Sequence, residues 1–373
     1  MIFYTFIIVL SGTLAWWAQK LSYKLISRTR ITVQDIFLNY FTYILIVLSA
    51  LPYFFTMTFR YGIGTDYFIT YYPTFVSASN PSIWHPHVET LYLFINNLVA
   101  SFTNQFAVML AITAAWIVTF FWLGIWKLSP IPWYSVILFG ALRHYFISMN
   151  GIRQYMGLAV VFFAFCFIKE KGWGGFVKYT LCILLGAMFH RSTLLFFPLY
   201  FLKFLVITPK IAVVLLTVGS ALNTPMRWFL RVILNLTPYK GHIGSTFDRA
   251  IRVIPHDFLL CLCIVLIGLF GYHECKKEPL FRFLFNLSLL AFFLSFNANL
   301  IPQSDRIEWS LSIGNMLIVP IVLSKINSRQ VRVAAEIGLL LLFGAYIYER
   351  IILSGDHQVY PYESILWMGH KFF

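Results

Sequence analysis

A succession of apolar segments, each about as long as a membrane-crossing helix, dominates the sequence. Of the 373 residues, 60% are hydrophobic and only 11% are charged, whereas an average soluble domain is about 25% charged. A water-soluble fold could not cover its surface with so few charges. The composition therefore excludes a soluble enzyme, a disordered chain and a disulfide-rich secreted module, and predicts an all-α, polytopic membrane protein.

Apolar runs and the residues that break them predict about twelve transmembrane helices, in a range of about 11–14. The segment 90–104 is apolar but short and carries Asn96 and Asn97 in its middle, so it either re-enters the membrane or lies on its surface. Residues 1–373 then form a single integral membrane domain, with an outer loop at 56–105 and a basic outer loop or lid at 223–257. The predicted spans are 2–18, 36–55, 106–126, 132–148, 152–168, 175–190, 193–207, 210–222, 257–272, 282–300, 308–324 and 333–353.

The basic residues predict the orientation. The formal net charge is +14, and most of the 28 lysines and arginines lie in short loops on one side, which the positive-inside rule assigns to the cytoplasm. The outer side carries ten arginines but only two lysines. Orientation needs only positive charge, whereas the planar guanidinium of arginine grips phosphate with two hydrogen bonds. An outer face rich in arginine therefore indicates chemistry on an anionic substrate there.

Three outer motifs carry candidate site residues. The first, RYGIGTDYFITYYPTF at 60–75, contains Arg60 and Asp66. It is either a glycine turn with an interfacial ion pair, or a phosphate-binding arginine with an aspartate that orients it or accepts a proton.

The second motif, MNGIRQYMGLAV at 149–160, places Arg153 at the start of an apolar helix. That arginine either snorkels to the interface or faces a polar cavity or bound anion. Arg143 and His144, near the preceding span, are weaker candidates.

The third motif, AMFHRSTLLFFP at 187–198, places His190 at a polar break between two apolar runs. Histidine is the residue most often used as a general base, although the break is also compatible with a simple turn. Elsewhere, PQSDRIEW at 302–309 offers Arg306, and Glu89 precedes the segment 90–104. His85 and His87 have no companion metal motif, so we predict no metal site.

The outer loop 223–257 carries more basic than acidic residues, against the positive-inside bias. Two pairs of arginines are spaced to share a helical face. The loop either contacts anionic lipid headgroups or is a lid that binds an anionic, lipid-linked substrate. Its candidate substrate-binding residues are Arg227, Arg231, Arg249 and Arg252.

In this order the motifs resemble the EpsG family of membrane proteins, which are Wzy-like polysaccharide polymerases. The resemblance covers nearly the whole chain, and RYGIGTDY is its most specific part. The matching residues are Arg60 with GTDY at 64–67, Tyr71 and Phe75, Glu89 before an apolar segment, NGIRQ at 150–154, FHRS at 189–192, Arg306 near a late helix start, and PYES at 361–364.

This resemblance implies an integral glycosyltransferase related to the GT-C class, at the outer face of the bacterial cytoplasmic membrane. Such a polymerase transfers a growing glycan from undecaprenyl diphosphate onto a new lipid-linked repeat unit, producing O-antigen, capsule or exopolysaccharide. Its implied partners are the lipid-linked donor and acceptor, membrane lipid and a chain-length regulator protein, with no nucleic acid.

The donor is already activated, so no nucleotide, cofactor or metal is expected. We assign the diphosphate to Arg60, Arg153 and Arg306, because arginines can stabilise the charge that develops on the leaving group. His190 and Asp66 compete for the role of base or orienting partner, and Glu89 is a reserve carboxylate.

Three other functions compete with polymerisation. A lipid-linked oligosaccharide flippase would also bind diphosphate, but it should show repeated halves and charges along a central cavity. A membrane O-acyltransferase would use a histidine, but its acyl-CoA comes from the cytoplasm, whereas His190 is predicted outside. An O-antigen ligase differs only in its acceptor, the lipid A core.

The predicted orientation is testable by labelling single cysteines in a cysteine-free background with an impermeant reagent. Loops 19–35, 169–178, 273–281 and 325–332 should be shielded in intact cells, and 56–89 and 223–256 should react. Labelling of 169–178 from outside would contradict both the orientation and an outward-facing site.

Overall fold

The computed structural model describes residues 1–26, 33–78, 88–248 and 250–367. Within these ranges every regular element is helical, and an isolated bridge joins the backbones of Arg60 and Ser364. The all-α prediction is therefore confirmed. The long and medium helices are α1 (Ile2–Ile26), α2 (Val33–Thr58), α4 (Thr90–Ala100), α5 (Phe106–Leu128), α6 (Pro132–Ala141), α8 (Ile152–Ala164), α9 (Gly172–Ala187), α11 (Pro209–Ala221), α12 (Asn223–Asn235), α13 (Pro255–Cys275), α14 (Pro279–Phe296), α15 (Ser304–Ser312), α16 (Asn315–Ser324) and α17 (Arg329–Ile347).

Short helical pieces connect or extend these helices, and proline begins several of the longer ones. The fixed φ of proline suits the first helical turn, and its missing N–H would have no partner there. The short pieces are η1 (Tyr67–Tyr71), α3 (Tyr72–Ser77), α7 (His144–Asn150), η2 (Phe165–Lys169), η3 (Arg191–Leu195), α10 (Phe196–Leu199), η4 (Tyr200–Phe204), η5 (Pro238–His242), η6 (Tyr348–Leu353) and η7 (Asp356–Gln358).

Eight helical stretches among the described residues are long and apolar enough to cross a membrane. The chain is thus a polytopic membrane protein, but the predicted count of about twelve exceeds this number. The stretches are Ile2–Tyr23, Ile36–Thr58, Phe106–Leu128, Ile152–Lys169, Pro255–Cys275, Pro279–Phe296, Ser304–Ser324 and Arg329–Leu353.

Four predicted spans are not uninterrupted helices of membrane-crossing length. The span at 132–148 is broken at Arg143, whose φ of 71° is left-handed and ends the helical path of α6 before α7 begins. The span at 193–207 consists of the short pieces η3, α10 and η4. In the remaining two, α9 has 16 residues and α11 has 13, whereas about 20 are needed to cross the hydrocarbon core. Hydropathy alone does not reveal such breaks.

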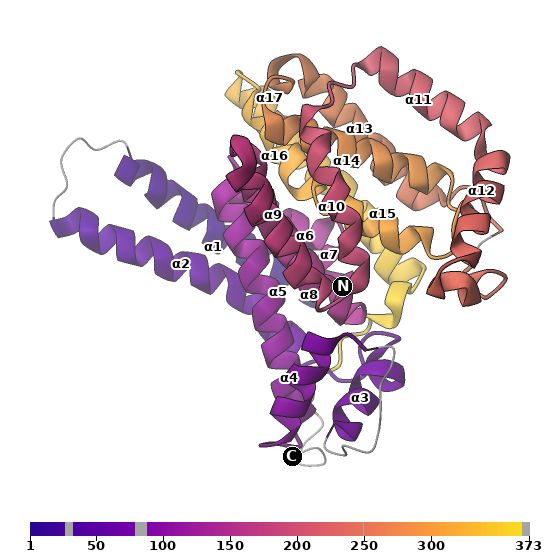
Figure 1. Cartoon of the computed structure of the whole chain (residues 1–373). Helices are drawn as coiled ribbons and strands as arrows, with labels where there is room; N and C mark the ends of the chain where they lie inside the picture. The colour runs from indigo at the N-terminus through magenta and orange to yellow at the C-terminus, as the bar shows by residue number, and fades with distance from the viewer. Residues whose placement is uncertain (27–32, 79–87, 249, 368–373) are drawn as a thin grey trace. The chain divides into compact units, whose positions relative to one another are not determined.

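Two compact units make up the described chain: the first comprises Met1–Phe197 and Val333–Phe373, and the second comprises Pro198–Arg332. In the first unit α1 and α2 form a long antiparallel pair (Figure 1). Helix α1 also packs on α6, α2 on α5, α5 on α8, and α8 on α9. Buried polar side chains find hydrogen-bond partners on neighbouring helices of this unit, because an unpaired polar group is costly away from water. Tyr53 Oη of α2 donates to Val136 O of α6 at 3.0 Å, and Trp122 Nε1 of α5 donates to Ser49 Oγ of α2 at 2.9 Å.

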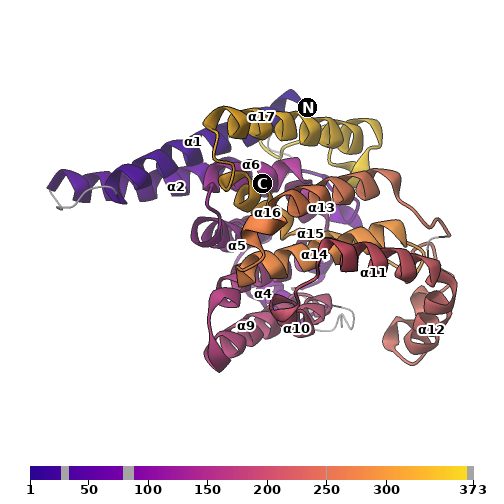
Figure 2. The same ribbon diagram turned by 90° about the horizontal axis from the view of Figure 1, so that it is seen from above.

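In the second unit α13, α14, α15 and α16 pack together (Figure 2). Short loops join α13 to α14 and α15 to α16. Arg282 and Asn286 of α14 hold η4 in place. Arg282 Nε donates to Lys203 O at 2.7 Å, and Asn286 Nδ2 donates to Leu202 O at 2.9 Å. Helices α11 and α12 extend from this group.

The crossing of α8 and α9 depends on glycine. A Cβ on Gly157 would lie 2.7 Å from Thr193 Cγ2 and 2.9 Å from Gly186 O. The two helices therefore meet backbone to backbone, and the turn that follows α9 is held against the start of α8. This contact brings the second and third sequence motifs together.

We predict that Gly157→Ala destabilises the fold by about 1–3 kcal/mol, because the added methyl group overpacks the helix crossing. Gly338 in α17 is a matched control, since a Cβ there meets no atom within 4 Å. Gly338→Ala should leave the melting temperature unchanged or slightly raised, because alanine favours the helix. Thermal unfolding in detergent distinguishes the two; equal melting temperatures for both variants would contradict the close crossing.

Candidate active site

Glu89, Arg153 and His190 form one site in the first unit. Glu89 directly precedes α4, Arg153 lies in the first turn of α8, and His190 lies in the turn between α9 and η3. Arg153 Nη1 donates to Glu89 Oε2 at 2.6 Å, and His190 Nδ1 lies 3.1 Å from Glu89 Oε1. Three segments that are far apart in sequence thus meet at one carboxylate.

Local backbone contacts fix the histidine. His190 has extended backbone angles and directly precedes η3, after the turn that follows α9. Both the backbone N–H and the hydroxyl of Thr193 donate to His190 O, at 3.1 and 3.0 Å. The Leu91 N–H donates to Met188 O at 3.2 Å, which fastens the start of α4 to the end of α9. These hydrogen bonds fix the position of His190 relative to Glu89.

The site is partly open. The side chains of Glu89, Arg153 and His190 are 9%, 18% and 23% exposed. Burial raises the pKa of Glu89, but the adjacent His190 imidazole and the Arg153 guanidinium outweigh this effect and lower the pKa to about 2. Glu89 is therefore an anion at neutral pH. With Arg153 and the exposed neighbour Arg191, the site keeps an excess of positive charge.

Arg60 has a different environment. Its side chain is 1% exposed, and its guanidinium donates to Met57 O at 2.5 Å and to Met149 O at 3.1 Å. Burial lowers its pKa, against the effect of neighbouring tyrosines. In this conformation Arg60 bonds the backbone instead of facing an open surface. Within the described chain its partners are these carbonyls and not Asp66, contrary to the pairing considered from the sequence.

The glycine loop of the first motif packs against the second motif. Gly64 has a φ of 98°, and a Cβ there would lie 3.1 Å from Met149 O. Asn150 Oδ1 accepts from the Thr65 hydroxyl at 2.9 Å and from the Asp66 N–H at 3.0 Å. Asp66 thus begins η1 beside Asn150, at the end of α7, whereas the carboxylate that contacts Arg153 and His190 is that of Glu89.

A second polar cluster, not predicted from the sequence, lies in the same unit. Arg143 Nη1 and Arg350 Nη2 both donate to Asp356 Oδ2, at 2.7 and 3.1 Å. His357 Nδ1 lies 3.0 Å from Asn150 Nδ2. Burial raises the pKa of Asp356, but the charges of Arg143, His357 and Arg350 lower it overall. The signal in the sequence was the polar stretch GDHQ at 355–358, directly after an apolar span.

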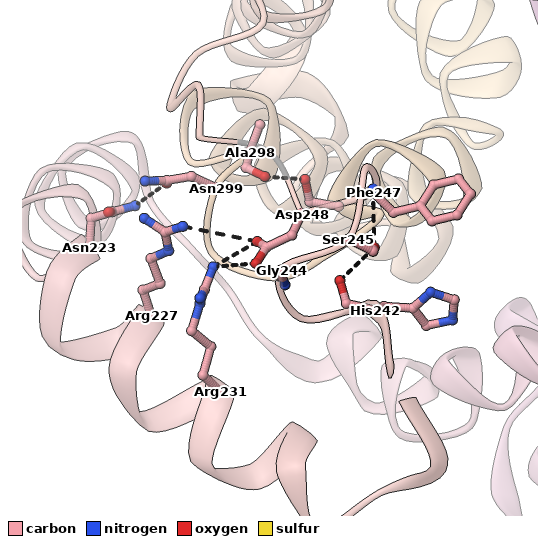
Figure 3. A network of polar contacts seen from close by, with 11 residues as sticks. Asn223, Arg227, Arg231, His242, Gly244, Ser245, Phe247, Asp248, Ala298 and Asn299 are labelled. Atoms are coloured by element: carbon pink, nitrogen blue, oxygen red, sulfur yellow. Dashed lines mark hydrogen bonds and ion pairs between the residues drawn. The ribbon is translucent and has the colours of Figure 1, made fainter. Parts of the chain in front are cut away.

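The second unit holds the other predicted arginines. Arg227 and Arg231 on α12 face Asp248, and Arg231 Nη2 lies 2.7 Å from both carboxylate oxygens (Figure 3). Arg252 donates to Ser220 O and lies over the Phe296 ring at 5.3 Å. Arg306 is in the first turn of α15, with its guanidinium 5.9 Å from the Phe247 ring.

The structure therefore brings together three of the predicted residues, Glu89, Arg153 and His190. Arg306, Arg227, Arg231 and Arg252 belong to the other unit. Arg249, His85 and His87 lie outside the described residues. In the part of the chain that is described, there is no group of three or more His, Cys, Asp or Glu side chains that could hold a metal ion.

Glu89 should make the stability of the fold sensitive to acid. Its pKa is about 2 in the folded protein against an ordinary value of 4.5, so its ionised form stabilises the fold above pH 4.5 and this contribution is lost as the pH falls toward 2. Between about pH 6 and about pH 3, wild type should lose about 2 kcal/mol more than Glu89→Gln, which cannot titrate.

Chemical unfolding in detergent at the two pH values measures this loss. Glu170→Gln removes an exposed ion pair with Lys178 and is the control; its stability gap to wild type should change by less than about 0.5 kcal/mol. A pH-independent gap between wild type and Glu89→Gln would show that Glu89 does not titrate as the geometry requires.

Comparison with known families gives a match that spans most of the chain. A family model described as the EpsG family matches residues 43–364. The match includes Glu89, Arg153 and His190, as well as the glycine loop and the tail with which that loop pairs. No curated protein and no solved structure matches the chain.

Proposed function

Because the chain belongs to the EpsG family of Wzy-like polysaccharide polymerases, we propose that it is a glycosyltransferase of the GT-C class that polymerises undecaprenyl-diphosphate-linked repeat units. The observation that carries this proposal is the meeting of Glu89, Arg153 and His190 at one partly open site. These residues supply a carboxylate, a phosphate-binding cation and a base.

In the proposed reaction, an acceptor hydroxyl attacks the anomeric carbon of the lipid-linked donor. A new glycosidic C–O bond forms, the C–O bond to the diphosphate breaks, and the lipid diphosphate leaves with the bonding electrons. His190 takes the hydroxyl proton. Because Nδ1 of His190 faces Glu89, the carboxylate favours the tautomer protonated on Nδ1 and leaves Nε2 to accept the proton.

Arg153 is the proposed diphosphate ligand in this site. A guanidinium carries several N–H donors in one plane, and the bond from Nη1 to Glu89 orients that plane while the side chain stays 18% exposed. The guanidinium then stabilises the negative charge that grows on the leaving diphosphate. In this proposal Glu89 orients the Arg153 guanidinium and the His190 imidazole, and does not itself act as the base.

Arg60 takes a positioning role in this proposal, because its donors bind Met57 O and Met149 O. Through Met149 it supports the turn that leads to Arg153. Asp66 remains the alternative base, and Arg306 with the loop 223–257 remains a candidate for contacts to the lipid-linked substrate. We further propose that the site faces outward from the bacterial cytoplasmic membrane, and that no metal or other cofactor takes part.

Substitutions of His190 and Arg153 test the two roles separately. His190→Gln should lower the polymerisation rate by about 10²–10⁴ while donor binding persists, because glutamine can hydrogen-bond but cannot take the proton. Arg153→Lys should weaken donor binding and also lower the polymerisation rate, because lysine keeps the positive charge but lacks the planar guanidinium that binds phosphate with two hydrogen bonds. The measurement is chain extension and donor affinity of the purified full-length chain with lipid-linked repeat units.

Matched controls are His273→Gln in the last turn of α13 and Arg329→Lys at the start of α17, both exposed and outside the site. Both should polymerise normally. Asp66→Asn should keep part of the activity if His190 is the base. An active His190→Gln enzyme together with an inactive Asp66→Asn enzyme that still binds donor would transfer the role of base to Asp66.

A further inference from the structure

Helix α12 exposes an apolar face. Trp228 is 69% exposed and Leu236, at its C-terminal end, is 85% exposed. Between them, Phe229, Val232 and Ile233 are also exposed. At helical spacing these five side chains share one side of the helix, and together they form an apolar face that would be unfavourable in water.

The basic side of the same helix is turned into the protein. Arg231 binds both oxygens of Asp248, and Arg227 approaches the same carboxylate at 3.9 Å (Figure 3). The Asp248 side chain is only 6% exposed, and the Gly244 N–H donates to it at 2.8 Å. This ion-paired cluster fixes the rotation of α12 about its own axis. Because the arginines on one side of the helix are bound to Asp248, the apolar side chains on the other side face outward.

The helix is also tied to segments at the edge of the membrane-crossing part of its unit. Asn223 Nδ2, at the start of α12, donates to Asn297 Oδ1 and Asn299 Oδ1 at 2.9 and 3.0 Å, directly after α14 ends. The candidate span α13 begins at Pro255, soon after Asp248. Asn223 is thereby fastened beside the end of one candidate span, and the segment that begins with α12 leads into another.

We infer that α12 lies in the plane of the membrane interface, with the face formed by Trp228, Phe229, Val232, Ile233 and Leu236 buried in the lipid monolayer. The helix has 13 residues and is about 20 Å long, too short to cross a hydrocarbon core of about 30 Å. An apolar face that includes a tryptophan suits the boundary between headgroups and acyl chains. The exposed Lys240 and Arg252 nearby suit anionic headgroups.

The in-plane placement of α12 is independent of the proposed catalytic function and changes the expectation for the loop 223–257. Two of the arginines considered as substrate ligands, Arg227 and Arg231, orient the helix through Asp248. The lipid occupies the opposite, apolar face. The loop then serves as an in-plane anchor of the second unit, to which it belongs.

Fluorescence quenching tests the anchor. An environment-sensitive dye is attached to a single cysteine at Phe229 or Ile233, in the full-length cysteine-free chain reconstituted into phosphatidylethanolamine–phosphatidylglycerol vesicles. The matched control is a cysteine at Thr224, which is exposed on the side of the helix away from these positions. Nitroxide-labelled lipid should quench the dyes at Phe229 and Ile233 several-fold more than the dye at Thr224, and aqueous iodide should show the opposite order.

Quenching by iodide to the same extent at all three positions would overturn the inference, because the face would then lie in water. Protection of Phe229 and Ile233 from both quenchers would also overturn it, because another protein or a second copy would then cover the face. The wild-type chain gives an independent measurement: lipids with a photoreactive acyl chain should form adducts within 228–236. Absence of adducts there, with adducts present in α13, would contradict the inference without any substitution.

Discussion

The candidate site depends on one carboxylate that is nearly buried between a guanidinium cation and an imidazole. Glu89 is 9% exposed and lies against both Arg153 and His190. A buried carboxylate without such partners would take up a proton or destabilise the fold. Here the two partners keep it ionised, and in return it fixes the positions of a guanidinium and an imidazole. The close crossing at Gly157 and Gly186 makes this meeting possible.

Part of this site was predictable from the sequence because its residues are costly in an apolar setting. Arg153 at the start of an apolar helix and His190 at a break between apolar runs needed an explanation, and both lie in the site. Glu89 was predicted only as a reserve, because nothing local in the sequence shows that α4 and the turn after α9 meet. Arg60, like Arg153, lies next to an apolar run in an outer motif, and both were assigned to diphosphate. In the structure, however, Arg60 is buried and bonds backbone carbonyls. Burial of this kind depends on tertiary contacts, so no local pattern distinguishes the two arginines.

The fold, too, was predictable from the sequence only in part. Composition and hydropathy predicted an all-α membrane protein, since lipid requires backbone hydrogen bonds to be made within helices. They predicted about twelve spans, whereas eight helical stretches among the described residues are long and apolar enough to cross. Hydropathy does not distinguish a continuous helix from an apolar run that is broken, as at Arg143, or divided into short helical pieces. Likewise, the arginine spacing in 223–257 indicated a shared helical face, but Asp248, which that face binds, lies beyond the helix. The polar stretch GDHQ at 355–358 marks Asp356, but nothing local in the sequence shows that Arg143, more than 200 residues away, is its partner.

We propose above all that Arg153 and His190, oriented by Glu89, act on a lipid-linked glycosyl diphosphate. The decisive measurement is an experimental structure of the full-length chain with a non-transferable lipid-linked donor bound. We expect diphosphate oxygens at about 2.7–2.9 Å from the Arg153 guanidinium, with the anomeric carbon facing the His190 side of the site. A diphosphate held elsewhere, with the Glu89, Arg153 and His190 cluster empty and unchanged, would contradict this role.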